Sequence, residues 1–205
     1  MSLTMRLMGI FIIPAAVLFL MFGEVIAKVL YFGIPTDDAN YLGITLSAFA
    51  LGLIPVSINL VLLRGLNAFE NLKSQVIGNF IMNLISVVLS LVAASYLEPE
   101  WVTVGLALIF TIHYFIGAGI SFILIKKHQV QIPVLSLITF YLKLILIFAA
   151  AVLPIWFFRY STPGGNLIYL LLVLSSSAIF YLLLLKAFKI SEITTLIKVI
   201  KGRKE

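Results

Sequence analysis

Residues 41–63 read YLGITLSAFALGLIPVSINLVLL, and this stretch decides the fold class. It has no charged side chain, and as a helix rising about 1.5 Å per residue it is long enough to cross a hydrocarbon core about 30 Å thick. Backbone N–H and C=O groups cannot stay unpaired in lipid, so a spanning segment is either a helix or a strand of a closed barrel. The run is too long and too uniformly apolar for a barrel strand, which predicts a transmembrane helix.

The same pattern recurs along the chain, separated by turn-forming segments such as Gly33–Asp38, Glu98–Glu100 and Ser161–Gly165. The sequence therefore predicts an all-α polytopic membrane bundle. Its six transmembrane helices are expected at Met5–Leu30, Tyr41–Leu63, Ser74–Tyr96, Trp101–Ile125, Pro133–Phe158 and Asn166–Leu185.

Composition supports a membrane protein over a soluble one. The chain has 205 residues, of which 62% are hydrophobic and 11% charged, whereas soluble domains average about 45–50% apolar and about 25% charged residues. The absence of cysteine excludes disulfides, thiolate metal sites and a cysteine nucleophile. The net charge of +6 comes from basic residues that flank the apolar runs, which indicates membrane orientation rather than nucleic-acid binding.

Lysine and arginine are distributed unevenly between the two sides of the predicted bundle. One side carries only Lys28 and Arg159, and Lys143 lies inside a span. By the positive-inside rule, the other side faces the cytoplasm together with both termini. Its basic residues are Arg6, Arg64, Lys73, Lys126, Lys127, Lys186, Lys189, Lys198, Lys201, Arg203 and Lys204.

The last segment, residues 190–205, is basic and less apolar than the spans. Ile193, Leu196, Ile197 and Ile200 fall on one helical face. This pattern predicts a short amphipathic helix on the anionic inner leaflet, with a frayed basic tail as the alternative.

No catalytic, metal-binding or cofactor-binding pattern is present. The two histidines, His113 and His128, have no acidic residue close by in the sequence. His113 lies in mid-span, where a hydrogen-bonded packing role and proton transfer are both open. We therefore predict a protein that is not an enzyme, with no metal ion and no cofactor.

Polar residues inside spans are costly in lipid and are the candidates for function. Asn79, Asn83, Ser86 and Ser90 share one face of the third span, where they either line a hydrated cavity or form interhelical hydrogen bonds. Lys143 lies roughly 15 Å into the fifth span, where we expect it to face a functional cleft, with snorkelling to the interface as the alternative. Glu24 and Lys28 have the i, i+4 spacing of a structural ion pair.

Proline residues lie within three of the spans. Pro14, Pro55 and Pro154 each remove a helical hydrogen bond, so each is expected to kink its helix.

Three stretches between Leu7 and about Lys127 resemble the second half of the MurJ/MviN family of lipid II flippases. Residues 41–55 look like a helix of the family, and Leu30-Tyr31-Phe32-Gly33, followed by Asp37 or Asp38, is similar to the family's Leu-Phe-x-x-Gly with a following Asp. Residues 64–75 begin with the family's Arg-Gly and carry Asn67, Asn71 and Gln75 where the family usually has Tyr, Asp and Pro.

This resemblance implies a fourteen-helix flippase of which the chain supplies the ninth to fourteenth helices, as an incomplete segment that is inactive alone. Residues 1–128 would be the four-helix remainder of a C-terminal lobe, 129–189 two further helices lining a groove for a lipid tail, and 190–205 the basic tail. Lys143, Asn79, Asn83 and Arg64 are the candidate substrate-pathway residues.

The implied partners are membrane lipid, a lipid-linked saccharide and the missing N-terminal lobe, in the bacterial inner membrane. Two alternatives stay open. One is a fragment of a polysaccharide or lipid-linked oligosaccharide flippase, and the other is a membrane scaffold subunit that transports nothing. An in-frame or adjacent upstream gene encoding the remaining spans would favour the flippase.

Overall fold

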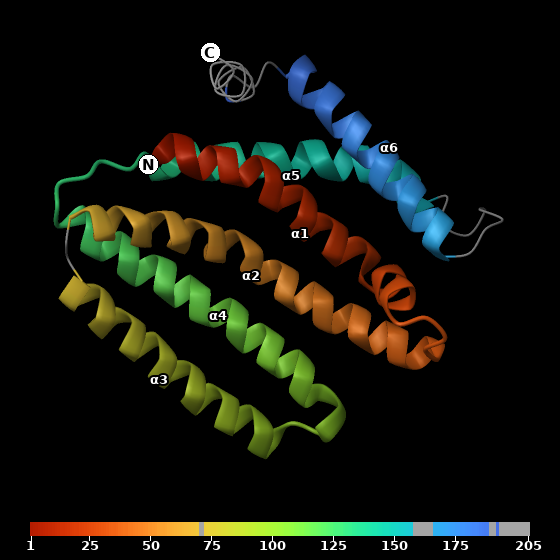
Figure 1. Ribbon diagram of the computed structural model, residues 1–205, viewed down its shortest axis with the longest axis horizontal. Coiled ribbons are helices and arrows are strands. Elements are labelled where there is room, and N and C mark those ends of the chain that lie inside the picture. The colour runs from red at the N-terminus through yellow and green to blue at the C-terminus, as the bar shows by residue number, and fades with distance from the viewer. Residues whose placement is uncertain (70–71, 158–165, 189–191, 193–205) are drawn as a thin grey trace, which may run out of the picture.

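The computed structural model describes residues 1–69, 72–157, 166–188 and 192. Within these residues, six helices are long and apolar enough to cross a membrane, which confirms the predicted all-α architecture (Figure 1). They are α1 (Ser2–Leu30), α2 (Thr36–Ala68), α3 (Leu72–Tyr96), α4 (Pro99–Lys126), α5 (Val134–Phe157) and α6 (Asn166–Ala187). The predicted amphipathic helix at 193–200 lies outside the described residues.

Helix α2 extends beyond the predicted span at both ends. It begins after Pro35, and Asp37 and Asp38 lie in its first turn, where carboxylates interact favourably with the positive end of the helix dipole. At the other end the helix continues through Arg64, which the hydropathy pattern had placed just beyond the span. Charged side chains thus mark where the apolar segment ends, while the helix itself continues.

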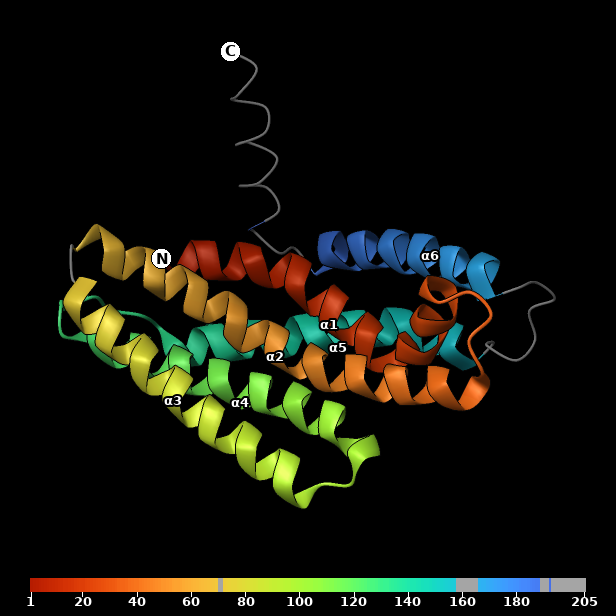
Figure 2. The same ribbon diagram turned by 60° about the horizontal axis from the view of Figure 1, so that its bottom comes forward.

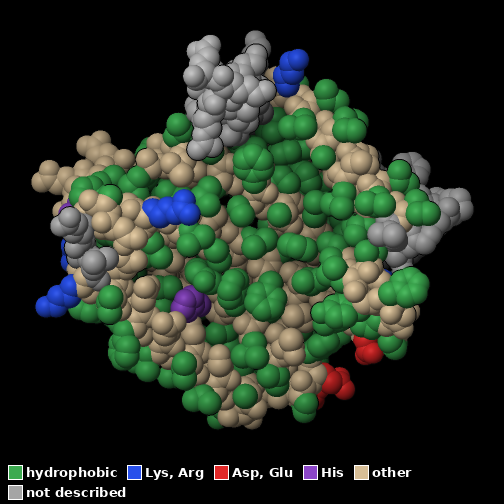
Figure 3. All heavy atoms as spheres, in the orientation of Figure 1, with side chains coloured by type: hydrophobic (Ala, Val, Ile, Leu, Met, Phe, Trp, Pro, Cys, Tyr) green, Lys and Arg blue, Asp and Glu red, His purple; other side chains and the backbone are tan. Residues whose placement is uncertain are grey.

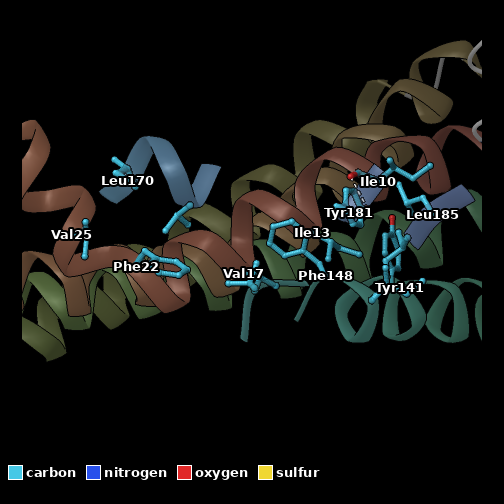
Figure 4. Packing of buried hydrophobic residues seen from close by; sticks show 14 of the residues in the cluster. Ile10, Ile13, Val17, Phe22, Val25, Tyr141, Phe148, Leu170, Tyr181 and Leu185 are labelled. Atoms are coloured by element: carbon cyan, nitrogen blue, oxygen red, sulfur yellow. Dashed lines mark hydrogen bonds between the residues drawn. The ribbon is translucent and has the colours of Figure 1, made fainter. Parts of the chain in front are cut away.

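Helix α1 lies at the centre of the contacts in the bundle, against α2, α5 and α6. Helix α4 packs on α2, and α3 packs mainly on α4 at the edge of the bundle opposite α6 (Figures 1 and 2). The largest buried cluster joins α1, α5 and α6 (Figure 4). Its most enclosed members are Ile13, Phe22, Leu144, Phe148, Val152, Val173 and Leu185.

The crossing of α1 and α2 depends on two glycines. A Cβ atom at Gly23 would lie 2.5 Å from the carbonyl oxygen of Gly43, and one at Gly43 would lie 2.5 Å from the backbone nitrogen of Glu24. Both contacts are with backbone, which cannot rotate away as a side chain can. Small residues permit such close approach of helices in membranes, where packing contacts replace the hydrophobic effect as the force for association.

Helix α1 has a proline at one position and non-helical backbone angles at another, and α6 contacts it at both. Pro14 has no N–H to donate to the carbonyl of Ile10, and the hydroxyl of Tyr181 donates to that carbonyl at 3.0 Å (Figure 4). Further along, Phe22 has non-helical angles of φ −121° and ψ 17°. The ring of Phe22 packs against that of Tyr169, with centroids 6.2 Å apart.

The departure from helical angles in α1 falls at a residue other than the proline, and the kinks expected at Pro14, Pro55 and Pro154 stay predictions. Pro14 lies within helical backbone, and the departure from helical angles falls at Phe22, beside the close glycine crossing. The hydroxyl of Tyr181 replaces the hydrogen bond that Pro14 removes, so the helix continues through the proline with that carbonyl satisfied.

The outer surface suits lipid. On the face shown in Figure 3 hydrophobic side chains are spread over the whole molecule, while lysine and arginine lie at the left and at the top and acidic side chains lie at the lower right. Helix α3 is the most exposed of the six spans. Only 17% of its most apolar stretch is buried inside the bundle. Its side chains contact either lipid or another protein.

Candidate functional site

A groove of about 560 Å³ runs between α5 and the end of α6. Because α5 residues at helical spacing point the same way, one face of α5 forms most of the wall. The lining is apolar except for a threonine and a lysine. It consists of Thr139, Leu142, Lys143, Leu146, Ile147 and Ala150 of α5, with Leu184 and Phe188 opposite.

Lys143 is the charged residue of this groove. It is exposed on the bundle surface, and its Nζ lies 5.4 Å from the ring centroid of Phe188. Among the described residues, no carboxylate forms an ion pair with it. A cation over an aromatic face gains about 0.5–2 kcal/mol, less than the cost of about 2.5–3.5 kcal/mol for a lysine at the centre of a spanning helix. The ring contact therefore offsets only part of that cost.

The other candidate pathway residues lie away from Lys143. Asn79 is half-buried and Asn83 is exposed, both on α3, at the opposite edge of the bundle from the groove (Figure 2). Arg64 is exposed near the end of α2. The structure therefore does not bring the four candidates into one site.

One member of the predicted α3 stripe forms an interhelical hydrogen bond. The hydroxyl of Ser86 lies 2.6 Å from Nδ1 of His113 on α4, and Ser90 is half-buried. For Ser86 this geometry favours the packing interpretation of the stripe. It also gives His113 a hydrogen-bond partner.

Glu24 and Lys28 are brought together on α1, with Lys28 Nζ 2.6 Å from Glu24 Oε1. Both side chains are about four-fifths buried, at 25% and 20% exposure. This ion pair joins residues one helical turn apart near the end of α1, so it is a local contact within that helix.

Two polar contacts were missed by the sequence analysis. Asn59 of α2 is only 2% exposed, and its Oδ1 accepts a hydrogen bond from the Ser121 hydroxyl of α4 at 2.7 Å. Asn59 could have been found as the amide in the otherwise apolar 41–63 stretch, since such residues mark buried contacts. The second contact joins Arg6 to Glu192, which are 2.6 Å apart, and no local pattern predicts it.

Comparison with known proteins decides the family. The family described as lipid II flippase MurJ matches residues 1–176, which is most of the chain. The chain belongs to the MurJ family. The match includes α5 and the first half of α6, beyond the point near Lys127 at which the recognisable motifs end. No curated protein matches the sequence.

Membership in the MurJ family makes the chain a multi-pass membrane protein of a family of transporters that handle the lipid-linked precursor of peptidoglycan. The family is one of flippases and not of enzymes. In the part of the chain that the structure describes, no group of three or more His, Asp or Glu residues could hold a metal ion.

Proposed function

We propose that this chain takes part in moving lipid II across the bacterial inner membrane, as one portion of an alternating-access flippase. The observation that carries the proposal is the MurJ family match over residues 1–176. In alternating access two repeats or bundles rock about a central site. The six described helices would supply one such bundle, and a second would come from the family's preceding helices.

The α5–α6 groove is proposed to hold the polyprenyl tail of the substrate. Its wall is apolar along α5 and open to the surrounding lipid, so a long hydrocarbon chain could enter sideways from the membrane. Lys143 would then contact the diphosphate that joins the tail to the saccharide. An ammonium facing a phosphate forms a charge-assisted interaction, which would supply the anionic contact that the ring of Phe188 does not provide.

The orientation is proposed from charge. The basic residues Arg6, Arg64 and Lys126 belong to the end of the bundle that would face the cytoplasm, and Asp38 and Glu100 belong to the opposite end. Both termini would then be cytoplasmic.

Complementation of a bacterium depleted of its own lipid II flippase tests the proposal. We expect no rescue by the chain alone, and rescue when the preceding helices of a MurJ-family protein are co-expressed with it. Rescue by these residues alone would exclude the need for a second bundle. Failure of every pairing, with membrane insertion verified, would favour a scaffold that transports nothing.

The role of Lys143 is tested in the rescuing pair. Lys143→Met keeps the length of the stem and removes the charge. We expect weaker lipid II binding, by about tenfold for a lost charge-assisted contact, with unchanged membrane insertion and thermal stability. Lys186→Met is the matched control, since Lys186 lies in the last turn of α6 and not in the groove lining. Unchanged binding in Lys143→Met would make Lys143 a snorkelling lysine.

A further inference from the structure

A second groove, of about 310 Å³, lies between α4 and α5. The described parts of these two helices have little direct contact, because α4 packs on α2 and α3 while α5 packs on α1 and α6. Side chains of α1 and α2 form the floor of the groove, and side chains of α4 and α5 form its walls. The lining is almost entirely apolar, and it includes Met5, Leu62, Phe115, Phe122, Leu137 and Ile138.

Gly119 of α4 leaves this groove open. A Cβ atom at Gly119 would have no atom of the described chain within 4 Å outside its own stretch of helix, whereas one at Gly117 would collide with the side chain of Met82. Gly117 therefore permits close helix packing, as small residues do in membranes. Gly119 permits no such contact, and glycine is less favourable than alanine inside a helix. The space beside Gly119 is thus suited to a group that comes from outside the described chain.

The groove opens into a polar recess at the end of the bundle where α4 ends and α5 begins (Figure 1). Phe122, Ile132 and Val134 line both the groove and the recess, whose volume is about 720 Å³. None of the described side chains that line the recess is acidic. Its polar lining consists of Lys126, Gln129 and Gln131. The recess therefore offers a positive charge and amide N–H groups to an anion.

Gln129 lines this recess at a backbone position that favours glycine. Its φ is 57°, in the left-handed region, and its backbone amide donates to the carbonyl of Lys126 at 3.0 Å. Glycine adopts this conformation without the steric cost that a Cβ atom brings. A larger residue at such a position points to a use for its side chain. The recess provides that use, since the Gln129 side chain can donate to an anion beside Lys126.

The length and polarity of the groove match one leaflet of a bilayer. Phe115 in the groove and Lys126 in the recess are roughly 16 Å apart along α4 at about 1.5 Å per residue. Half of a hydrocarbon core is about 15 Å thick. Water is not favoured in the apolar groove, because it finds too few hydrogen-bond partners there. A hydrocarbon chain fits the groove, and a phosphate at the level of the headgroups then meets Lys126.

We propose that this groove binds one acyl chain of an anionic phospholipid, whose phosphate contacts Lys126 and Gln129 in the recess. The chain fills the space beside Gly119 and joins α4 to α5 through lipid. The lysine selects an anionic headgroup over a zwitterionic one. The groove uses the face of α5 that carries Tyr141, whereas Lys143 lies on the face toward α6. The proposal therefore does not depend on the role of Lys143 in transport.

The test measures retention of phosphatidylglycerol by the purified full chain in native mass spectrometry, with phosphatidylcholine as the zwitterionic comparison. Gly119→Leu fills the groove and is expected to lower retention of both lipids several-fold. Its Cβ atom meets no described neighbour, so the helix content in circular dichroism should stay the same. Lys126→Gln leaves the groove open and should lower retention of phosphatidylglycerol alone, by about fivefold for one lysine near an anionic lipid.

Gln129→Gly separates the headgroup contact from folding. The change relieves the left-handed backbone strain, so thermal stability should stay equal or rise. Retention of phosphatidylglycerol should fall nonetheless, and that of phosphatidylcholine should not change. A loss of this kind cannot come from misfolding. Full phosphatidylglycerol retention in both Gln129→Gly and Lys126→Gln would overturn the headgroup site.

Two matched controls lie outside the groove and the recess. Ala94→Leu adds similar bulk on α3, where Ala94 is exposed, and Lys186→Gln removes a lysine from the last turn of α6. Both variants should retain phosphatidylglycerol as the wild type does. Equal retention in Gly119→Leu and Ala94→Leu overturns the proposal. So does a lipid-free dimer that Gly119→Leu dissociates, because a second copy of the chain would then occupy the groove.

Discussion

Removing the hydroxyl of Tyr181 should destabilise the bundle through a carbonyl on another helix. In Tyr181→Phe the carbonyl of Ile10 loses the donor that lies 3.0 Å away, and Pro14 provides no amide to replace it. Interhelical hydrogen bonds in membrane proteins contribute about 0.6 kcal/mol on average and at most about 1.7. A buried carbonyl left unsatisfied costs about 1–3 kcal/mol. We therefore expect a loss of about 1–2 kcal/mol.

The proline makes this prediction unusually specific. In a Pro14→Ala background the amide of residue 14 donates to Ile10 as in any helix, so the same Tyr181→Phe change should cost at most about 0.6 kcal/mol. The double-mutant cycle should accordingly show a coupling of about 1 kcal/mol between two residues that share one carbonyl.

The assay is equilibrium unfolding of the purified chain by sodium dodecyl sulfate in mild detergent, followed by circular dichroism. Tyr96→Phe is the matched control, because Tyr96 is 85% exposed at the end of α3 and its change should fall within about 0.5 kcal/mol. An equal cost of Tyr181→Phe in both backgrounds would refute the view that Tyr181 completes the hydrogen bonding of α1 at Pro14.

Three further results are expected. Gly43→Leu should cost at least about 3 kcal/mol or prevent folding, because its first side-chain atom meets α1 backbone at 2.5 Å; a stable folded variant would contradict this crossing. Ser121→Ala should cost about 0.6 kcal/mol by removing the donor to Asn59, and no change would show that water replaces it. Because the chain has no cysteine, Asp38→Cys should react with an impermeant thiol reagent from outside whole cells and Lys127→Cys only after lysis, and the reverse pattern would overturn the orientation.

Hydropathy predicted the spans because each spanning segment must by itself contain about 20 apolar residues to cross the hydrocarbon core as a helix. It was less accurate at the ends of α2, since helix geometry tolerates charged residues such as Asp37 and Arg64 beyond the apolar segment. Helix α1 also departs from helical angles at Phe22, beside the glycine crossing, and the sequence analysis did not predict that position. The cost of a proline can be read from the sequence, but the donor that satisfies the freed carbonyl comes from α6 and cannot.

The two ion pairs show the same limit. Glu24 and Lys28 are one turn apart on a helix, so their contact follows from helical geometry alone. Arg6 and Glu192 are 186 residues apart in the sequence, and their contact depends on how the first and last described segments meet. The groove residue Lys143 could be singled out by its cost in lipid, whereas its neighbour Phe188 could not.

The contact between Pro14 and Tyr181 also bears on how the protein is made. Helix α1 leaves the ribosome before α6, and it enters the bilayer with the carbonyl of Ile10 not hydrogen-bonded by an amide of its own helix. The Tyr181 hydroxyl that donates to this carbonyl lies 171 residues later in the sequence. Until α6 arrives, that carbonyl needs a temporary partner such as water or the lining of the insertion machinery. The hydrogen bonding of α1 is thus complete only after α6 has been synthesised and has packed against it.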